Sequence, residues 1–389
     1  MNYWWFWLLA LASNLAAAAM NVAVLWALGD NRVPVIVQPL QLFGGAIGTV
    51  LGAVQGARFA RRWGLIGTLK RTSLLEAAIA VAIGACAWSP TGHLSPSQSV
   101  AVVVLTGVAA FAVGAGGPAW VSLVSAWPGA GGTTKQVLRD STQFQLGRTI
   151  GPLIGALILG LTSYALQWSA ALNALTYLAI AAFMHHLSLT GHDEGSPTRD
   201  AAPAGSIIPW RAVAPVLLIP IVLLAVAWDA GRVYLARVLH AAGMDGSFFS
   251  VIVSTMALAA VTAATIGLRF EARTKALAFI GLASCTAGLG LWGLAGNSAP
   301  FWLAGAILVG AGSSLAVNAT TALAVDAKPD RRPETVATLT ITRTSVAAIG
   351  GMALAPVYVA LTTAFFVPVA AILAIALLPM AVVFRRNTA

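Results

Sequence analysis

Apolar residues fall in long runs along this chain, and short polar segments separate the runs. Each run has about the 20 residues that a helix needs to cross a hydrocarbon layer of ~30 Å. Inside lipid, backbone N–H and C=O groups must be paired within the protein, so such runs are expected to be helices. The pattern predicts an all-α membrane protein with twelve transmembrane helices, near residues 4–28, 34–57, 73–90, 99–126, 142–165, 169–188, 210–237, 247–268, 276–295, 300–324, 336–359 and 363–384.

One polar stretch is longer than the others and divides the predicted helices into two sets of six. Residues 189–208 are rich in Gly, Ser, Pro and charged residues, which is typical of a linker. We therefore expect an N-terminal six-helix bundle over 1–188, a cytoplasmic linker over 189–208 and a C-terminal six-helix bundle over 209–389.

The two halves share short matches that occur in the same order, which indicates an internal repeat. Two six-helix halves in parallel repeat, with a site between them, is a transporter architecture. The matches pair Val113-Gly114-Ala115-Gly116 with Val309-Gly310-Ala311-Gly312, Arg148-Thr149 with Arg343-Thr344, and the segment 56–62 with 267–273.

A glycine occurs at every fourth position along the second predicted helix, at Gly44, Gly48, Gly52 and Gly56. Residues at this spacing share one helix face, where another backbone can approach closely. The pattern fits either ordinary tight packing or a surface on which the two halves rock.

Composition excludes a soluble domain, because only 9% of the 389 residues are charged and 59% are apolar. Soluble proteins carry roughly 25% charged residues. Most Lys and Arg residues lie in loops that become cytoplasmic if both termini are cytoplasmic, as the positive-inside rule favours. We expect a multi-pass protein of the plasma membrane, in bacteria the inner membrane. The net charge of +10 is spread over these loops, so no nucleic-acid partner is expected.

The segment from Ala57 to Gly64 resembles the G-x-L-A-D-R-x-G signature of the major facilitator superfamily. In the family, the acid of this signature latches the loop to neighbouring helices. Arg61 stands at the acidic position here, so the resemblance implies a latch that is altered or absent. The residues that we expect to carry the motif's conformational role are Arg58, Arg61, Arg62 and Gly64.

A second segment, from Gly147 to Ala156, resembles the G-x-x-x-G-P-x-x-G-G motif of exporters in that family. Its conformational residues are Gly147, Gly151, Pro152 and Gly155, and Pro152 predicts a kink because it removes a backbone donor. Arg148 before the Gly-Pro pair is similar to the branch of enterobactin-type siderophore and multidrug exporters. The resemblance implies the twelve-helix major facilitator fold and an export function.

Charged side chains inside the bilayer are costly, and they mark candidate functional sites. Asp229 and Arg232 lie three residues apart on one predicted helix face. They form either a self-neutralising pair or a site where Asp229 takes up and releases a proton. Glu76 is the second proton-coupling candidate, although Ser73 and Glu76 also have the spacing of a capping box at a helix start.

Several other polar residues within the predicted spans are candidates for substrate binding. Arg148 and Arg343 either extend to the membrane interface or face a cavity and bind a carboxylate or phosphate. Each uncharged candidate is either an interhelical hydrogen-bond partner or a ligand contact. The substrate-binding candidates are Arg148, Arg343, Arg232, Asn14, Asn21, Gln38, Gln41, Gln145 and Asn318.

A histidine and acid cluster ends the sixth predicted helix and enters the linker: His185, His186, His192, Asp193 and Glu194. Its residues lack helical ligand spacing, so no metal site is expected. Cys86 and Cys285 lie inside apolar runs and are interpreted as packing residues.

These observations favour a secondary-active transporter, most simply a proton-coupled exporter of a small anionic or amphipathic molecule such as a siderophore or drug. Uptake of an organic anion, lipid flipping, an integral membrane enzyme and a non-transporting receptor are the alternatives. The chain has no G-x-x-x-x-G-K-[ST] loop for ATP, and no cofactor is expected. The expected partners are a small-molecule substrate, protons and the lipid bilayer, with the chain itself a monomer.

Overall fold

The computed structural model describes residues 3–88, 93–126, 133–189, 215–267, 273–326 and 332–385. The chain divides into two compact units, Met1–Ala204 and Gly205–Ala389. Most of the expected linker lies outside the described residues, so its boundaries remain a prediction. The described part consists of helices joined by short turns and contains no strand, and nine of its helices are long and apolar enough to cross a membrane.

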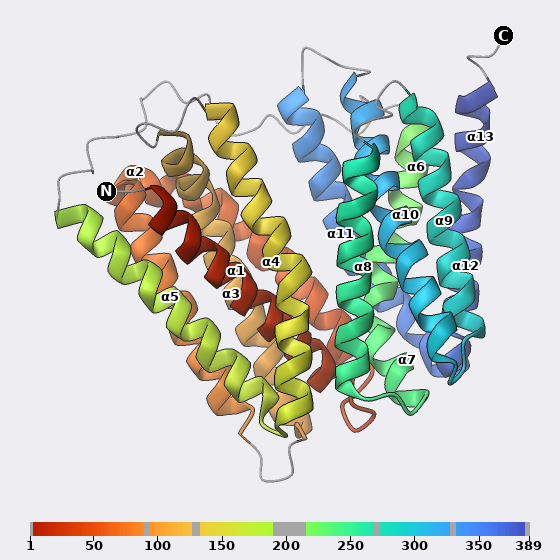
Figure 1. Cartoon of the computed structure of the whole chain (residues 1–389), viewed down its shortest axis with the longest axis horizontal. Helices are drawn as coiled ribbons and strands as arrows, with labels where there is room; N and C mark the ends of the chain where they lie inside the picture. Colours follow the sequence, from red (N-terminus) through yellow and green to blue (C-terminus); the bar gives the residue numbers. More distant parts are fainter. Residues whose placement is uncertain are drawn as a thin grey trace. The chain divides into compact units, whose positions relative to one another are not determined.

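Five helices form the N-terminal unit, and Figure 1 shows them running together as one bundle. Helix α2 packs against α3 and α5, while α1 packs against α4 and α5. The bounds are α1 (Tyr3–Leu28), α2 (Val37–Cys86), α3 (Pro96–Ala126), α4 (Thr133–Leu161) and α5 (Ala165–Leu189).

Helix α2 contains two of the predicted spans, and the loop expected between 57 and 73 is wrong. The helix continues through this segment, and Gly64 is the one residue within it that departs from helical geometry, with φ 72° and ψ 172°. Only glycine adopts this backbone region without strain. The chain therefore passes from one span to the next through a single glycine, which explains physically why the motif ends in Gly64.

Replacing Gly64 by alanine is expected to destabilise the N-terminal unit by about 1–2 kcal/mol, because a Cβ is strained at this φ and ψ. Gly67 is the matched control. It lies in regular helix, and an added Cβ would meet only the Cβ of Trp63, at 3.4 Å. Gly67→Ala should be neutral or slightly stabilising. Unfolding by sodium dodecyl sulfate in mixed micelles compares the two, and equal stabilities would contradict this account of Gly64.

The glycines of α2 bring it into backbone contact with α3, within the same unit. A Cβ at Gly48 would overlap the carbonyl oxygen of Gly107, and one at Gly52 would lie 2.8 Å from the amide nitrogen of Ala115. Gly44 has nothing within 4 Å of its added Cβ. This arrangement supports the packing interpretation of the glycine stripe, since three of its four positions face a neighbouring helix of the N-terminal bundle.

The C-terminal unit supplies six further spans. The first is an interrupted helix that includes a π-helical turn, η3, and a 3-10 turn, η4. The bounds of this unit are α6 (Pro215–Leu224), η3 (Ala225–Ala230), η4 (Gly231–Tyr234), α7 (Leu235–Ala241), α8 (Gly246–Gly267), α9 (Thr274–Leu294), α10 (Ala299–Asp326), α11 (Arg332–Leu361), η7 (Thr362–Ala364), α12 (Phe366–Ile375) and α13 (Leu377–Arg385). With α2 counted as two spans, α6 to α7 as one and α12 with α13 as one, the described chain has the twelve predicted spans.

The repeated Gly-Ala-Gly segments pack in corresponding ways in the two units. In the N-terminal unit, an added Cβ at Gly114 would overlap Thr49 in the first half of α2, and one at Gly116 would touch Thr72 in its second half. In the C-terminal unit, Gly310 meets Met256 of α8 and Gly312 meets Cys285 of α9. Each segment therefore lets one helix approach two neighbours, which gives the repeat a physical reason.

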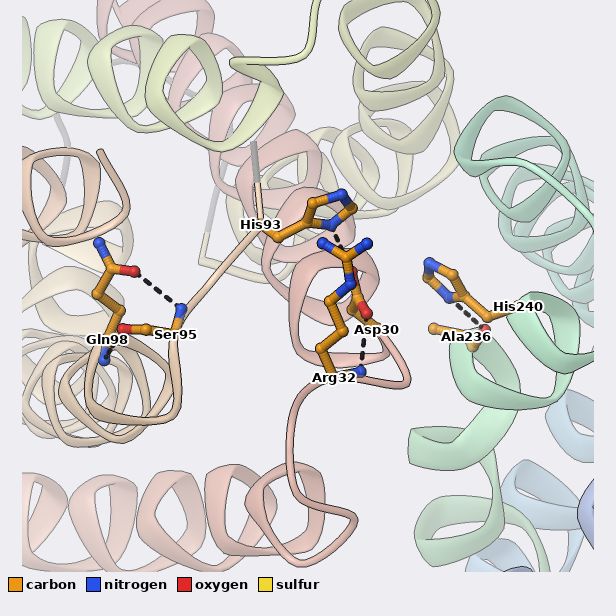
Figure 2. Close-up of polar contacts among 7 residues, drawn as sticks. All are labelled: Asp30, Arg32, His93, Ser95, Gln98, Ala236 and His240. Carbon is orange, nitrogen blue, oxygen red and sulfur yellow. Dashed lines mark hydrogen bonds and ion pairs between the residues drawn. The ribbon is translucent and has the colours of Figure 1, made fainter. Parts of the chain in front are cut away.

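Side chains define several helix ends. Ser95 and Gln98 form a reciprocal capping box at the start of α3: the Ser95 amide donates to Gln98 Oε1 at 2.8 Å, and the Gln98 amide donates to Ser95 Oγ at 3.3 Å (Figure 2). Asp245 caps α8 by accepting from the Phe248 amide at 2.8 Å. That bond, together with the Ser247 hydroxyl, holds the pKa of Asp245 below its usual value.

Candidate functional site

The C-terminal unit contains a partly buried ion pair between Asp229 of η3 and Arg343 of α11. Arg343 Nη2 donates to Asp229 Oδ1 at 2.7 Å, and Arg343 Nε donates to the second carboxylate oxygen. The side chain of Asp229 is 9% exposed and that of Arg343 is 31% exposed. Two parallel charge-assisted bonds of this kind are strong and fix the orientation of both groups.

Close packing between η3 and α11 brings the two charges together. An added Cβ at Gly350 would lie 3.3 Å from Val226 Cγ2 and 3.4 Å from Ala230 Cβ, so no larger residue fits there without a shift. The Tyr234 hydroxyl also donates to the Gly351 carbonyl at 2.6 Å. Arg343 precedes Gly350 by seven residues, about two helical turns, so both face the same neighbour.

Arg343 also borders a small cavity of about 100 Å³ inside the C-terminal unit. Its Nε and Nη2 are used by Asp229, and no described residue accepts from its Nη1. The remaining wall is apolar apart from two threonines. The guanidinium group is therefore held by a carboxylate on one side and borders open space on another.

Arg232 takes no part in this arrangement. It is exposed, and the local pair expected from its spacing to Asp229 is replaced by the pair with Arg343. The reason is the irregular backbone, since Asp229 lies in a π-helical turn and Arg232 in a 3-10 turn. Residues three apart share a face in an α-helix, and that rule does not apply across these turns.

The N-terminal unit contains a larger cavity, of about 260 Å³, lined by α1, both halves of α2, α3 and α5. Two of the predicted substrate-binding residues, Asn21 and Gln41, line it together with Glu76. Asn173 and Tyr177 of α5 also line it, and they were not among the candidates from sequence. The cavity combines these polar groups with alanine, valine, isoleucine and methionine side chains.

Glu76 lies deep in this cavity, and the capping-box interpretation of Ser73 and Glu76 is wrong. Both residues are inside the continuous helix α2, and Glu76 is only 8% exposed. The Tyr177 hydroxyl donates to the Glu76 carboxylate, and the Ser13 hydroxyl donates to Tyr177. A hydrogen-bonded chain from α1 through α5 therefore holds this carboxylate in place.

Two of the predicted polar residues tie helices together. Asn14 donates to Gln143 Oε1 at 2.7 Å and so joins α1 to α4. Gln38 is fully buried and donates to the Leu25 carbonyl at 3.3 Å, which joins α2 to α1. Gln143 was missed from sequence, where its neighbour Gln145 was chosen. The one sequence signal for Gln143 was its position in the same polar helix segment as Gln145.

Three further candidates are Asn318, Arg148 and Gln145, and a contact is described for Asn318 alone. Asn318 is exposed and donates to Ser314 Oγ at 3.5 Å. The backbones of Arg148 and Gln145 belong to α4, but their side chains lie outside the described part of the structure. For this reason the proposed cavity-facing role of Arg148 remains a prediction.

The glycines of the α4 motif pack against α1. An added Cβ would lie 2.5 Å from Asn14 Cβ at Gly147 and 2.5 Å from Ala18 Cβ at Gly151, and 3.2 Å from the Ala19 carbonyl at Gly155. Pro152 lies inside the same helix. The motif therefore sets how closely α1 and α4 approach each other.

The basic motif residues Arg58, Arg61 and Arg62 are exposed on α2 just before the Gly64 break. Beyond the break, the guanidinium of Arg71 lies 4.2 Å from the ring centre of Trp63, a cation–π contact. Trp63 in turn stacks on Phe59, with ring centres 4.6 Å apart. These contacts stabilise the two helical segments on either side of the break.

The family model of the Major Facilitator Superfamily matches residues 6–352 of this chain. No curated protein matches the sequence. The sequence comparison therefore reaches the superfamily and does not identify a branch within it.

Solved transporter structures share the fold at low sequence identity. The nucleoside transporter NupG is 12% identical with a TM-score of 0.76, covering 97% of this chain and 98% of its own. A D-xylose-proton symporter is 13% identical with a TM-score of 0.74, covering 98% and 97%. A bacterial homologue of the iron transporter ferroportin, in an inward-facing state, is 14% identical with a TM-score of 0.73, covering 97% of both chains.

Proposed function

Because the chain belongs to the Major Facilitator Superfamily, a family of alternating-access transporters, we propose that it couples transport to protons through Asp229. Family and fold indicate a transporter of small molecules rather than an enzyme. The observation that carries the proposal is the partly buried pair of Asp229 with Arg343. We also propose a monomer in the plasma (bacterial inner) membrane with both termini cytoplasmic, as the loop charges favour.

Protonation of Asp229 changes what Arg343 can bind. A neutral carboxyl group cannot hold the guanidinium through two charge-assisted bonds, so the forked donor set of Arg343 becomes available to an anionic group. Linkage makes this effect reciprocal: an anion on Arg343 favours the protonated form of Asp229 to the same extent. Asp229 can therefore take up a proton when Arg343 takes up a substrate anion, and the two groups then no longer bind each other.

The first candidate direction is export, in which inward proton flow drives a siderophore- or drug-like amphipathic molecule outward. It is supported by the glycine and proline motif of α4, which resembles the motif of exporters. Proton-driven export requires proton and substrate to bind in alternation. For an anionic substrate, that alternation would need a proton site other than the pair of Asp229 with Arg343.

The second candidate is uptake of an organic anion, and the ion pair favours it. A proton on Asp229 and an anion on Arg343 would bind together and move in the same direction. An inward proton gradient would then carry the anion inward. The small cavity beside Arg343, of about 100 Å³, has room for a carboxylate or a group of similar size.

Transport assays with Asp229→Asn test the proton role. A metabolite comparison of cells with and without the protein first identifies a transported compound, and flux is then measured in proteoliposomes with a pH gradient. We expect Asp229→Asn to abolish gradient-driven flux but keep counterflow exchange, which needs no net proton movement. Asp245→Asn is the matched control, because asparagine caps a helix as well as aspartate does. Undiminished gradient-driven flux in Asp229→Asn would place the proton site elsewhere.

Whether substrate binding takes up or releases protons distinguishes uptake of an anion from export. The compound is added to purified protein in weakly buffered solution while the pH is recorded. Proton uptake on binding supports joint transport of proton and anion, whereas proton release supports exchange and therefore export.

A further inference from the structure

The N-terminal cavity has a polar floor and a more open side. Glu76 and Asn173 are 8% and 2% exposed, whereas Asn21, which also lines the cavity, is exposed. At about 260 Å³ it lies just under the roughly 300–1,000 Å³ of typical ligand sites, so it suits a small ligand or one end of a larger one.

One buried residue of the cavity wall, Asn173, has a hydrogen-bond acceptor that the described residues do not satisfy. Asn173 Oδ1 has no hydrogen-bond partner among the described residues, and it is closed to solvent, so a ligand in the cavity reaches it only when the Asn173 side chain turns. Its amide nitrogen is directed instead to the sulfur of Met20, at 3.4 Å. An unsatisfied buried acceptor costs about 1–3 kcal/mol, so a ligand that donates to it gains affinity.

The lining of the cavity includes an acidic side chain and no basic one. Glu76 is the one ionisable carboxylate among the described lining residues, and none of these residues is Lys, Arg or His. Tyr177 donates to Glu76 through one hydroxyl, which leaves further acceptor positions on the carboxylate. A ligand with a positive charge and several N–H donors matches these two acceptors.

We propose that this cavity binds the ammonium group of a small amphipathic amine, with Glu76 as its counter-ion and Asn173 Oδ1 as a second acceptor. The apolar wall contacts the hydrocarbon part of the amine. Asn21 and Gln41 add amide groups that can bond to other polar atoms of the ligand. The described residues contain no cluster of three His, Cys, Asp or Glu that could hold a metal ion, and the apolar wall suits an organic cation.

This proposal rests on the transporter function for its choice of a small molecule as ligand, but it does not depend on Asp229 or on proton coupling. It concerns equilibrium binding to the N-terminal unit. Its test therefore uses the full-length protein without a pH gradient, so that its failure can be told from failure of the coupling mechanism.

The experiment compares three probes of equal length: n-hexylammonium, 1-hexanol and n-hexanoate. Binding to the purified protein in nanodiscs is measured by isothermal titration calorimetry. We expect n-hexylammonium to bind at least about tenfold more tightly than 1-hexanol, because it adds charge-assisted hydrogen bonds. Glu76→Gln should remove this preference, and Asn173→Ala should weaken ammonium binding about threefold or more. Asp245→Asn, far from the cavity in sequence and in the other unit, should keep the preference.

A second measurement on the unaltered protein guards against a misfolded Glu76→Gln variant. Dicyclohexylcarbodiimide labels carboxyl groups within membranes, and mass spectrometry locates the product. n-Hexylammonium should protect Glu76 from labelling, whereas 1-hexanol and sodium chloride should not. Equal affinities for the three probes, or protection by sodium chloride alone, would overturn the proposal.

Discussion

Replacing Asp229 by asparagine is expected to destabilise the protein by about 3 kcal/mol, because it leaves the guanidinium of Arg343 without its counter-charge. Loss of one partner of a buried ion pair typically costs about 3–5 kcal/mol. We expect the lower end, since the Arg343 side chain keeps 31% exposure and can be partly hydrated. Unfolding by sodium dodecyl sulfate in mixed micelles measures the change.

The two single variants should differ, because only one of the residual groups can become neutral. Arg343→Gln leaves a carboxyl group that can take up a proton, whereas Asp229→Asn leaves a guanidinium that stays charged. We expect Arg343→Gln to cost less, and the double variant Asp229→Asn with Arg343→Gln to return within about 1 kcal/mol of the original stability. If the stability losses of the two single variants add up in the double variant, the interaction between Asp229 and Arg343 contributes little to stability.

Replacing Gly52 by alanine is expected to be the most damaging single-methyl change in the N-terminal unit, at about 3 kcal/mol or more. The added Cβ would overlap the Phe111 carbonyl and lie 2.8 Å from the Ala115 amide nitrogen. These are backbone atoms of α3, so no side chain can turn away to make room. The two helices must move apart, and overpacking of this kind typically costs about 1–3 kcal/mol, occasionally more.

Gly44→Ala is the control for this prediction. Gly44 lies two turns earlier on the same helix face, but nothing lies within 4 Å of its added Cβ. Alanine there should be neutral or should stabilise the helix by up to about 1 kcal/mol. The same detergent titration compares both variants, and equal effects would mean that α2 and α3 can separate at little cost.

The fold was predicted well from sequence, because a long apolar run in a membrane can satisfy its backbone hydrogen bonds in few ways. The continuous course of α2 was missed, since the basic residues between Arg58 and Arg71 were interpreted as a loop. Arginine and lysine are good helix formers, and a helix also satisfies its backbone as it leaves the bilayer. A single residue, Gly64, is enough to break the helical geometry of α2.

The candidate site was predicted less completely, because its contacts join distant parts of the chain. Asp229 was identified as a buried charge, but its partner Arg343 lies 114 residues further along. Local spacing indicated Arg232 instead, and the π-helical turn that invalidates this spacing leaves no clear sequence signal. Likewise Tyr177 and Asn173 reach the cavity of Glu76 only through the packing of α5 on α2.

The uninterrupted helix before Gly64 also fixes how deeply its span can sit among the lipids. Arg58, Arg61 and Arg62 follow the apolar span Val37–Gly56 at positions i, i+3 and i+4, so they form one cationic face on a rigid rod. Lipid phosphates attract such a face at the level of the headgroups. Sliding of this span along the membrane normal would move three arginines into hydrocarbon or away from the headgroups, and the cost of either opposes that motion.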